Sequence, residues 1–418
     1  MKHFSFVVLC PVLYMFLIGA CTNGNERKIG DQTSDHSNVR EVYIQPNKKM
    51  SLHTKDFIAS VQYIPLETTD ESEFGDISQI QIVGDYYLIL DKLANEILFF
   101  RKNGDFVKKI SAKNEDIPLP FKRISNFTVD TKSEILSFPD ASAPLVYEFD
   151  LLGNFKKTRD KAPIDYTIHE SFYLNKYKID YFSYDHPISD NAQTPNITIS
   201  ENSRALKSYL YFDPASIDQE DVYGAEKYFF KSTGHLLFSR PYDYTIYSFE
   251  DTGEMNPYLQ ISLSQELRLP SDFLTSSKYI NQRRAYTNTN KYIVYKITDV
   301  YKIHNILYFR LMGSKYIKAL LYDLNTEALV DFRDYVSDVS TLYLPIAGRN
   351  VLGVDSNRLV SAMPASQLIR ALNANISVEG YLSSLPDHLK EYYKKGNNQN
   401  PILVLTKLKE SIQYETGN

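Results

Sequence analysis

Short runs of apolar residues, often alternating with polar ones and separated by brief polar turns, fill most of the chain from about residue 41 onward. A period of two residues is typical of strands with one buried face, whereas a helix repeats its apolar positions every 3.6 residues. Strands and tight turns therefore dominate the predicted secondary structure.

A spaced motif recurs within these runs: an aromatic residue, three residues, glycine, one residue and an apolar residue. The copies run from Phe100 to Phe106 (FRKNGDF), from Phe149 to Phe155 (FDLLGNF) and from Phe249 to Met255 (FEDTGEM), and a degenerate copy from Tyr322 to Ala328 (YDLNTEA) has Thr326 in place of glycine. Because glycine accepts the positive φ of a tight turn, each copy predicts two strands joined as a β-hairpin. The three copies that contain glycine are separated by one or two steps of about 50 residues, so the chain contains a structural repeat.

An apolar strand pair split by a short polar turn precedes each hairpin. The turns fall at Gly84-Asp85, Asp130 to Lys132, Ser232 to Gly234 and His304-Asn305, with a fifth at Asp355 to Asn357 and the weakest at Asn175-Lys176, which leads into Tyr177 to Tyr184 and then Ser208 to Phe212. Units of four short strands at this spacing are typical of propeller blades, so we predict an all-β fold, a six-bladed β-propeller. Ser60 to Leu66 and Pro401 to Leu408 are both strand-like, and we expect them to share one blade and close the ring.

The pattern changes to a helical period between Pro364 and Gly396. Apolar stripes at Leu368, Ala371 and Leu372, and again from Leu385 to Tyr393, predict a helical insertion in the last blade, at about residues 364–396. We hypothesise that these helices cover one mouth of the propeller.

The amino terminus has the form of a secretory signal. Lys2 precedes an apolar run from Phe4 to Leu17, and Ile18-Gly19-Ala20 leads into Cys21, which resembles a bacterial lipobox. We therefore predict a signal peptide at residues 1–20, a lipid-anchored tether at 21–40 and the propeller at 41–418, with Cys21 carrying acyl chains such as palmitate. The alternatives are an ordinary signal peptide or a transmembrane helix, although the run is shorter than the roughly 20 residues that a span needs. Thr22 after the cysteine is typical of outer-membrane lipoproteins, so we expect the cell envelope, at the outer membrane.

The chain also resembles a known family. Val61 to Thr69 (VQYIPLETT), Tyr87 to Ile110 (YLILDKLANEILFFRKNGDFVKKI) and Asn400 to Lys409 (NPILVLTKLK) are similar to segments of the six-bladed β-propeller lipoproteins of Bacteroides and related gut bacteria. The resemblance covers most of the chain from about residue 41 and implies the fold and an envelope location. One departure is that Ala112 to Phe121 lacks the glycines that the family usually carries after its first hairpin.

Composition and motifs exclude several classes of function. The net charge is −5, so no basic excess favours nucleic acid, and 33 tyrosines and 23 phenylalanines favour strands. Cys10 and Cys21 are the two cysteines, so the body can form neither a disulfide framework nor a thiolate metal site. The sequence contains no GxSxG, GxGxxG, P-loop, HExxH or EF-hand pattern, and we expect no cofactor and no metal.

Four residues are candidates for ligand binding: His235, His304, Asp140 and Asp243. The two histidines sit at equivalent turns of different blades, and the aspartates recur after strands, so they could converge on one face. The alternative is structural, because exposed turns accept histidine and aspartate caps turns by accepting backbone N–H groups.

Other clusters have a structural interpretation beside a functional one. The tyrosines around residues 177–184 and 242–247 could contact a sugar, a peptide or a protein, or could fill the space between blades. Arg283-Arg284-Tyr286 could meet an anionic group but is more typical of a solvated loop, and His169-Glu170 is interpreted as solvated loop because no second histidine follows four residues later.

We predict a membrane-anchored, non-catalytic binding platform for a protein partner or a saccharide or peptide ligand. The alternatives are a polysaccharide lyase or hydrolase with its site at the channel mouth, and a scaffold component of an outer-membrane uptake assembly. Fold alone does not decide between them.

Overall fold

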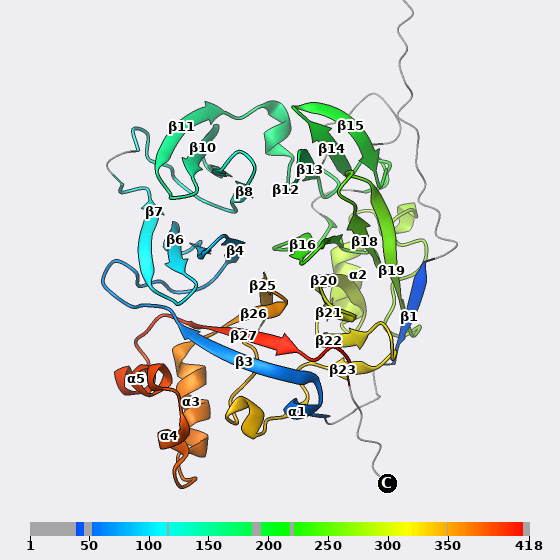
Figure 1. Ribbon diagram of the computed structural model, residues 1–418. Coiled ribbons are helices and arrows are strands. Elements are labelled where there is room, and N and C mark those ends of the chain that lie inside the picture. Colours follow the sequence, from blue (N-terminus) through cyan, green and yellow to red (C-terminus); the bar gives the residue numbers. More distant parts are fainter. Residues whose placement is uncertain are drawn as a thin grey trace, which may run out of the picture.

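The computed structural model describes residues 39–45, 52–114, 117–185, 194–217, 221–348 and 350–412, and within these residues six antiparallel sheets form a ring (Figure 1). The chain is a six-bladed β-propeller, as the repeat predicts. In each blade the first strand lies beside the central axis, where it contacts the first strands of other blades.

Five blades are continuous in sequence, and their bounds are as follows. Blade 1 contains β4 (Gln79–Val83), β5 (Tyr86–Asp91), β6 (Glu96–Arg101) and β7 (Phe106–Ser111), and blade 2 contains β8 (Thr128–Asp130), β9 (Ile135–Pro139), β10 (Leu145–Asp150) and β11 (Phe155–Asp160). Blade 3 contains β12 (Glu170–Leu174), β13 (Tyr177–Tyr181), β14 (Ile197–Glu201) and β15 (Arg204–Tyr209). Blade 4 contains β16 (Phe229–Ser232), β17 (His235–Phe238), β18 (Thr245–Phe249) and β19 (Met255–Leu263), and blade 5 contains β20 (Val294–Ile303), β21 (Ile306–Gly313), β22 (Ile317–Asp323) and β23 (Leu329–Asp331).

Blade 6 joins the two ends of the described chain, as predicted. It contains β25 (Val351–Asp355), β26 (Arg358–Met363), β27 (Ile402–Leu408) and, as its outer strand, the N-terminal β3 (Ile58–Pro65). The antiparallel register runs from Ile402 opposite Pro65 to Leu408 opposite Ile58. Buried Asn400 strengthens this closure, because its side-chain amide donates to the carbonyls of Glu67 (2.7 Å) and Ser72 (2.8 Å).

The chain before β3 follows the outside of the ring. β1 (Arg40–Ile44) pairs in parallel with β19 and adds a fifth strand to blade 4. β2 (Leu52–His53) pairs in parallel with β24 (Tyr335–Val336), which follows blade 5, and the short helix α1 (Thr54–Phe57) leads into β3. The N-terminal segment thus touches blades 4, 5 and 6 in turn.

The predicted hairpins are confirmed, and their glycines also fix the spacing of the blades. Gly104 in the β6–β7 turn has φ +96°, and a Cβ built there would lie 2.1 Å from the Pro65 carbonyl oxygen of blade 6. A Cβ at Gly253, in the β18–β19 turn, would meet the Tyr177 ring of blade 3 at 3.2 Å. Each turn therefore rests directly on the preceding blade.

Two departures from the prediction have local causes. In the degenerate copy, Thr326 replaces glycine and the positive φ moves to Glu327 (φ +59°), so the turn is displaced by one residue and Tyr322 pairs with Leu329. In blade 3 the turn at Asn175-Lys176 is correct, but the last strand is β15 at Arg204–Tyr209 rather than Ser208 to Phe212. β15 begins with the exposed residues 204–206, and Arg204 and Lys207 are charged, so no apolar alternation marks where this strand starts.

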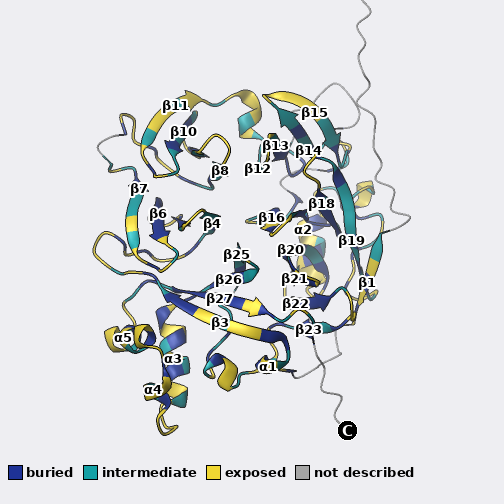
Figure 2. Ribbon diagram, viewed as in Figure 1, coloured by how far each residue is buried: buried dark blue, intermediate teal, exposed yellow. Residues whose placement is uncertain are grey.

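The hydrophobic core lies between neighbouring blades. One cluster joins blades 1 and 2, another joins blades 3 and 4, and a larger one spans blades 4, 5 and 6. Tyr181 and Tyr247 lie buried between blades 3 and 4. These two tyrosines therefore fill the space between blades, which is the structural one of the two predicted roles. The outer strands are more exposed, as β11 and β15 show in Figure 2.

The helical insertion of blade 6 consists of α3 (Ala365–Asn375), α4 (Tyr381–Ser384) and α5 (Asp387–Lys395). Their apolar side chains pack on Tyr63 of β3 and on Ile402 and Val404 of β27. The helices lie outside the ring, beside β3 (Figure 1), so the hypothesis that they cover a mouth of the channel is wrong. Among the described residues, no helix has the length and apolar character to cross a membrane.

The propeller has two faces. The turn between the first and second strand of each blade lies on one of them, which we term the turn face. The opposite end carries the turns between second and third strands and the long connections between blades, and we term it the loop face.

The contact of Gly104 with blade 6 yields a test. Gly104→Ala should lower the free energy of unfolding by about 2 to 4 kcal/mol, from the left-handed backbone and from steric overlap together. Gly84→Ala is the matched control, since its φ is +54° and nothing lies within 4 Å of a Cβ there, and it should cost about 1 kcal/mol. If the two variants lose the same free energy of unfolding in urea, the β6–β7 turn does not set the spacing between the blades.

Candidate functional site

The first strands of the blades surround a central channel, and the described residues enclose a cavity of about 220 Å³ in it. Residues of β4, β8, β12, β16 and β25 line this cavity. Gln79 and Gln81 link blades 1 and 2 there, because both side-chain amides donate to the Phe127 carbonyl, at 2.8 and 3.0 Å. The channel wall thus contains polar contacts between blades as well as apolar packing.

Glu170, the first residue of β12, brings a carboxylate to the loop-face end of the channel. Its Oε2 accepts hydrogen bonds from the backbone N–H groups of Tyr228 (2.5 Å) and Phe229 (3.1 Å), at the beginning of blade 4. Burial raises the pKa of the Glu170 carboxyl to about 7, although Lys227 and these two N–H groups act in the opposite direction. Glu170 therefore ties blade 3 to blade 4 and titrates near neutrality.

Lys227 reaches across the channel from the connection between blades 3 and 4. Its Nζ donates to the Tyr301 hydroxyl of blade 5 (3.3 Å) and to the Leu352 carbonyl of blade 6 (3.4 Å), and lies 5.4 Å from the centre of the Tyr301 ring. Burial lowers the pKa of the Lys227 amine, while Glu170 and Asp299 raise it. One amine thereby connects three blades.

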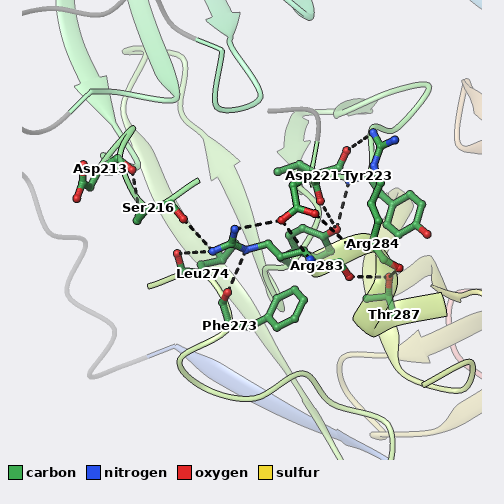
Figure 3. A network of polar contacts seen from close by, with 11 residues as sticks. Asp213, Ser216, Asp221, Tyr223, Phe273, Leu274, Arg283, Arg284 and Thr287 are labelled. Atoms are coloured by element: carbon green, nitrogen blue, oxygen red, sulfur yellow. Dashed lines mark hydrogen bonds and ion pairs between the residues drawn. The ribbon is translucent and has the colours of Figure 1, made fainter. Parts of the chain in front are cut away.

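The connection that carries Lys227 is anchored by Arg283, the first residue of α2 (Arg283–Thr289). The Arg283 side chain is fully buried, and Figure 3 shows its guanidinium among the carbonyls of Ser216, Phe273 and Leu274. Its Nη1 lies 3.4 Å from Oδ2 of Asp221, which also accepts the Arg283 backbone N–H at 3.1 Å. The interpretation of Arg283 as part of a solvated loop is therefore wrong.

A groove adjoins the channel on the turn face, between blades 3 and 4. It has a volume of about 590 Å³ and shares Thr131, Phe172, Tyr173, Lys231 and Ser232 with the lining of the channel. Its lining includes four charged side chains, Lys132, Lys176, Lys231 and Asp251, together with the imidazole of His235. We term it the turn-face groove.

His235, one of the predicted ligand-binding residues, lines the turn-face groove. Its Nε2 lies 3.2 Å from Nζ of Lys302, and burial, followed by the charge of Lys302, lowers the pKa of the imidazole. Within the described residues, no carboxylate forms an ion pair with Lys231 or Lys302, whereas Lys176 pairs with Glu201 at 3.1 Å. The groove thus holds an excess of positive charge beside a neutral imidazole.

The other predicted residues lie elsewhere. His304, with φ +50°, is exposed in the β20–β21 turn, on the same face as His235 but one blade further along. Asp140 follows β9 and Asp243 precedes β18, so both lie on the loop face. The structure therefore does not bring the four residues together.

Both aspartates act as turn caps in the structure. Asp140 is fully buried and accepts the backbone N–H groups of Lys122 (2.6 Å) and Ser142 (2.8 Å). Asp243 accepts the N–H of Thr245 and forms an ion pair with Arg240 at 3.0 Å. A role of either residue in ligand binding stays a prediction.

The predicted lipidation residue, Cys21, lies outside the described residues. Within the part of the chain that is described, no three His, Cys, Asp or Glu side chains gather in a way that could hold a metal ion.

Sequence reasoning missed Glu170 and Lys227. The sequence pattern predicts a solvated loop for His169-Glu170, yet Glu170 begins the innermost strand of blade 3 and its carboxylate accepts from backbone N–H groups 58 and 59 positions away. No local pattern signals this contact. One signal could have found Glu170: it is a charged residue at the end of the first, innermost strand of a blade.

Comparisons with known proteins agree with the fold. A family model described as "Domain of unknown function (DUF4934)" matches residues 38–407. No curated protein sequence matches the chain. A structure of an exported protein from Bacteroides fragilis is 17% identical, with a TM-score of 0.65, covering 89% of this chain and 99% of that one. A DUF4221 family member from Bacteroides vulgatus is 10% identical, with a TM-score of 0.45, covering 84% of this chain and 97% of that one.

Arg283 provides a test of how the loop face is held. Arg283→Leu should lower the free energy of unfolding by about 3 to 5 kcal/mol, because it leaves buried Asp221 without its partner. Adding Asp221→Leu should recover part of that loss. Lys278→Met, which removes an exposed cation paired with Asp272, should leave urea unfolding unchanged. An unchanged free energy of unfolding in Arg283→Leu would show that the backbone alone holds the connection between blades 3 and 4.

Glu170 provides a test by pH. A carboxyl whose pKa is higher in the folded than in the unfolded chain binds its proton more tightly on folding, so stability falls as pH rises from about 4.5 through 7. The Glu170→Gln variant has no carboxyl to titrate at this position. Its free energy of unfolding relative to wild type should therefore increase as pH rises across that window, by up to about 3 kcal/mol. Urea unfolding at pH 4.5 to 8 measures the difference, with Glu391→Gln on exposed α5 as control. A difference that is constant with pH would place the Glu170 pKa outside the window.

Proposed function

The chain belongs to the DUF4934 family, and from that premise we propose that it is a lipid-anchored binding protein of the bacterial cell envelope. Its propeller receives a carboxylate-bearing saccharide or peptide ligand in the turn-face groove, without catalysing a reaction. The anchor is Cys21, at the end of the lipobox-like Ile18-Gly19-Ala20-Cys21. Acyl chains on this cysteine would hold the protein at the membrane, since two chains already suffice for stable attachment.

The observation that carries the ligand proposal is the uncompensated charge at this groove. Lys231, which lines the groove, lacks a carboxylate partner among the described residues, and His235 in the same lining contacts Lys302, which likewise lacks one. A carboxylate that enters beside Lys231 and His235 would gain charge-assisted hydrogen bonds from them. Phe172 and Tyr173 in the same lining offer apolar surface for the body of the ligand.

The geometry supports binding more than the lyase or hydrolase alternative. That alternative required His235 and His304 to converge with at least two aspartates. Asp140 and Asp243 lie on the opposite face, and both carboxylates are engaged by backbone N–H groups. The groove contains one carboxylate, Asp251, which accepts a hydrogen bond from Asn175 at 3.1 Å.

Calorimetric titration of the soluble chain from Val39 onward tests the proposal. An oligogalacturonate or a glutamate-rich peptide should bind, and Lys231→Ala should weaken that binding about tenfold at low salt. Lys315→Ala, which removes an exposed cation outside the groove, should have no effect. Loss of binding in the control as well would indicate a general charge effect.

The pH dependence gives a second readout of the same site. A bound anion favours the imidazolium form of His235, so affinity should rise as pH falls below the usual histidine range. His235→Gln should flatten this dependence. Capture of the lipoprotein from its own membranes, with mass spectrometry, addresses the protein-partner alternative: a stoichiometric partner without binding of either acidic probe would overturn the ligand proposal.

A further inference from the structure

Blade 6 differs from blades 1, 2, 4 and 5 in one connection on the loop face. Its second and third strands are joined by residues 364–401, which carry α3 to α5, whereas residues 92–95, 140–144, 239–244 and 314–316 join the corresponding strands of blades 1, 2, 4 and 5. The shorter connections show that a blade closes without helices. The insertion is therefore an addition to the fold, and additions on one face of a repeat often build its binding surface.

The insertion creates one wall of a second groove, of about 640 Å³, on the loop face. The opposite wall consists of Phe332, Tyr335 and Tyr343, from the connection between blades 5 and 6. This groove shares no lining residue with the channel or the turn-face groove, so we term it the loop-face groove.

Tyr343 is held exposed at the loop-face groove by a strained backbone. Leu342 and Tyr343 both have φ +54°, a left-handed conformation that costs side chains of this size energy. The surrounding structure enforces it, because the Tyr343 N–H donates to the Asp338 carbonyl (2.9 Å) and the Tyr381 hydroxyl of α4 donates to the Leu342 carbonyl (2.8 Å). The Tyr343 side chain nevertheless remains 46% exposed, so burial does not repay the strain.

The facing side of α3 combines small residues with amides. Ala371 and Ala374 line the middle of the groove, with Gln367 one turn before them and Asn375 at the end of the helix. Leu368 and Leu372 form the neighbouring stripe of the same helix and are fully buried. The alanines leave space beside the aromatic wall, and each amide offers both a donor and an acceptor.

The charge of this groove distinguishes it from the turn-face groove. No carboxylate lines it among the described residues, and Arg333 is its one ionisable side chain other than tyrosine. Aromatic faces paired with amide groups suit the apolar faces and hydroxyls of an uncharged sugar ring. We propose that the loop-face groove binds a neutral oligosaccharide, with Tyr343 as the stacking residue and Gln367 as a hydrogen-bonding residue.

Titration with neutral hexasaccharides tests this site in the soluble chain. The probes are maltohexaose, xylohexaose, mannohexaose and chitohexaose, each followed by calorimetry up to millimolar concentration. At least one should bind, and Tyr343→Ala and Gln367→Ala should each weaken that probe about tenfold. Ala374→Trp, which fills the groove from an exposed position, should abolish binding.

Matched controls separate the site from general effects on the fold. Tyr43→Ala removes an exposed tyrosine on β1, and Ala205→Trp adds a large side chain on exposed β15; both should bind the probe as the unsubstituted protein does. No binding of any neutral hexasaccharide, or unchanged binding by folded Tyr343→Ala and Ala374→Trp, would overturn the proposal. Lys231→Ala leaves this site untouched, so failure here and failure of the acidic ligand at the turn-face groove are distinguishable.

Discussion

The pairing of β3 with β27 is the contact on which the rest of the molecule depends. Six blades enclose a channel only if the ring is closed, and here closure requires an outer strand supplied by residues 58–65 and an inner neighbour supplied by residues 402–408. Buried Asn400 adds hydrogen bonds to Glu67 and Ser72 at the same junction. Sheet edges that would otherwise stay open are thereby satisfied.

Polar groups carry part of the cohesion near the axis. Glu170 joins blades 3 and 4, and Lys227 joins the connection before blade 4 to blades 5 and 6. Both groups have pKa values displaced by burial, Glu170 upward and Lys227 downward. The charged state of the channel is consequently coupled to how tightly neighbouring blades are held, while the two grooves lie at separate places on the faces.

The fold was largely predictable because its rules are local and repeated. The aromatic and glycine positions of each hairpin recur at fixed spacing, and Gly104 and Gly253 each make the turn that the motif predicts. The site was much less predictable, because its contacts join residues far apart in sequence. Arg283 and Asp221 are 62 positions apart, and nothing beside either of them indicates a buried pair. Asp140 and Asp243 recur for a local reason, the capping of turns, which the repeat alone cannot distinguish from a ligand site.

The path of the N-terminal segment ahead of β3 has a mechanical consequence. A pull on the chain ahead of Arg40 would first load β1 against β19 and then β2 against β24, before any tension reached the β3–β27 junction. The two outer strand pairings therefore bear the load one after the other, and both can break before the pairing that closes the ring is strained. A propeller held by its amino terminus in moving fluid could lose them one after the other and still remain a closed ring.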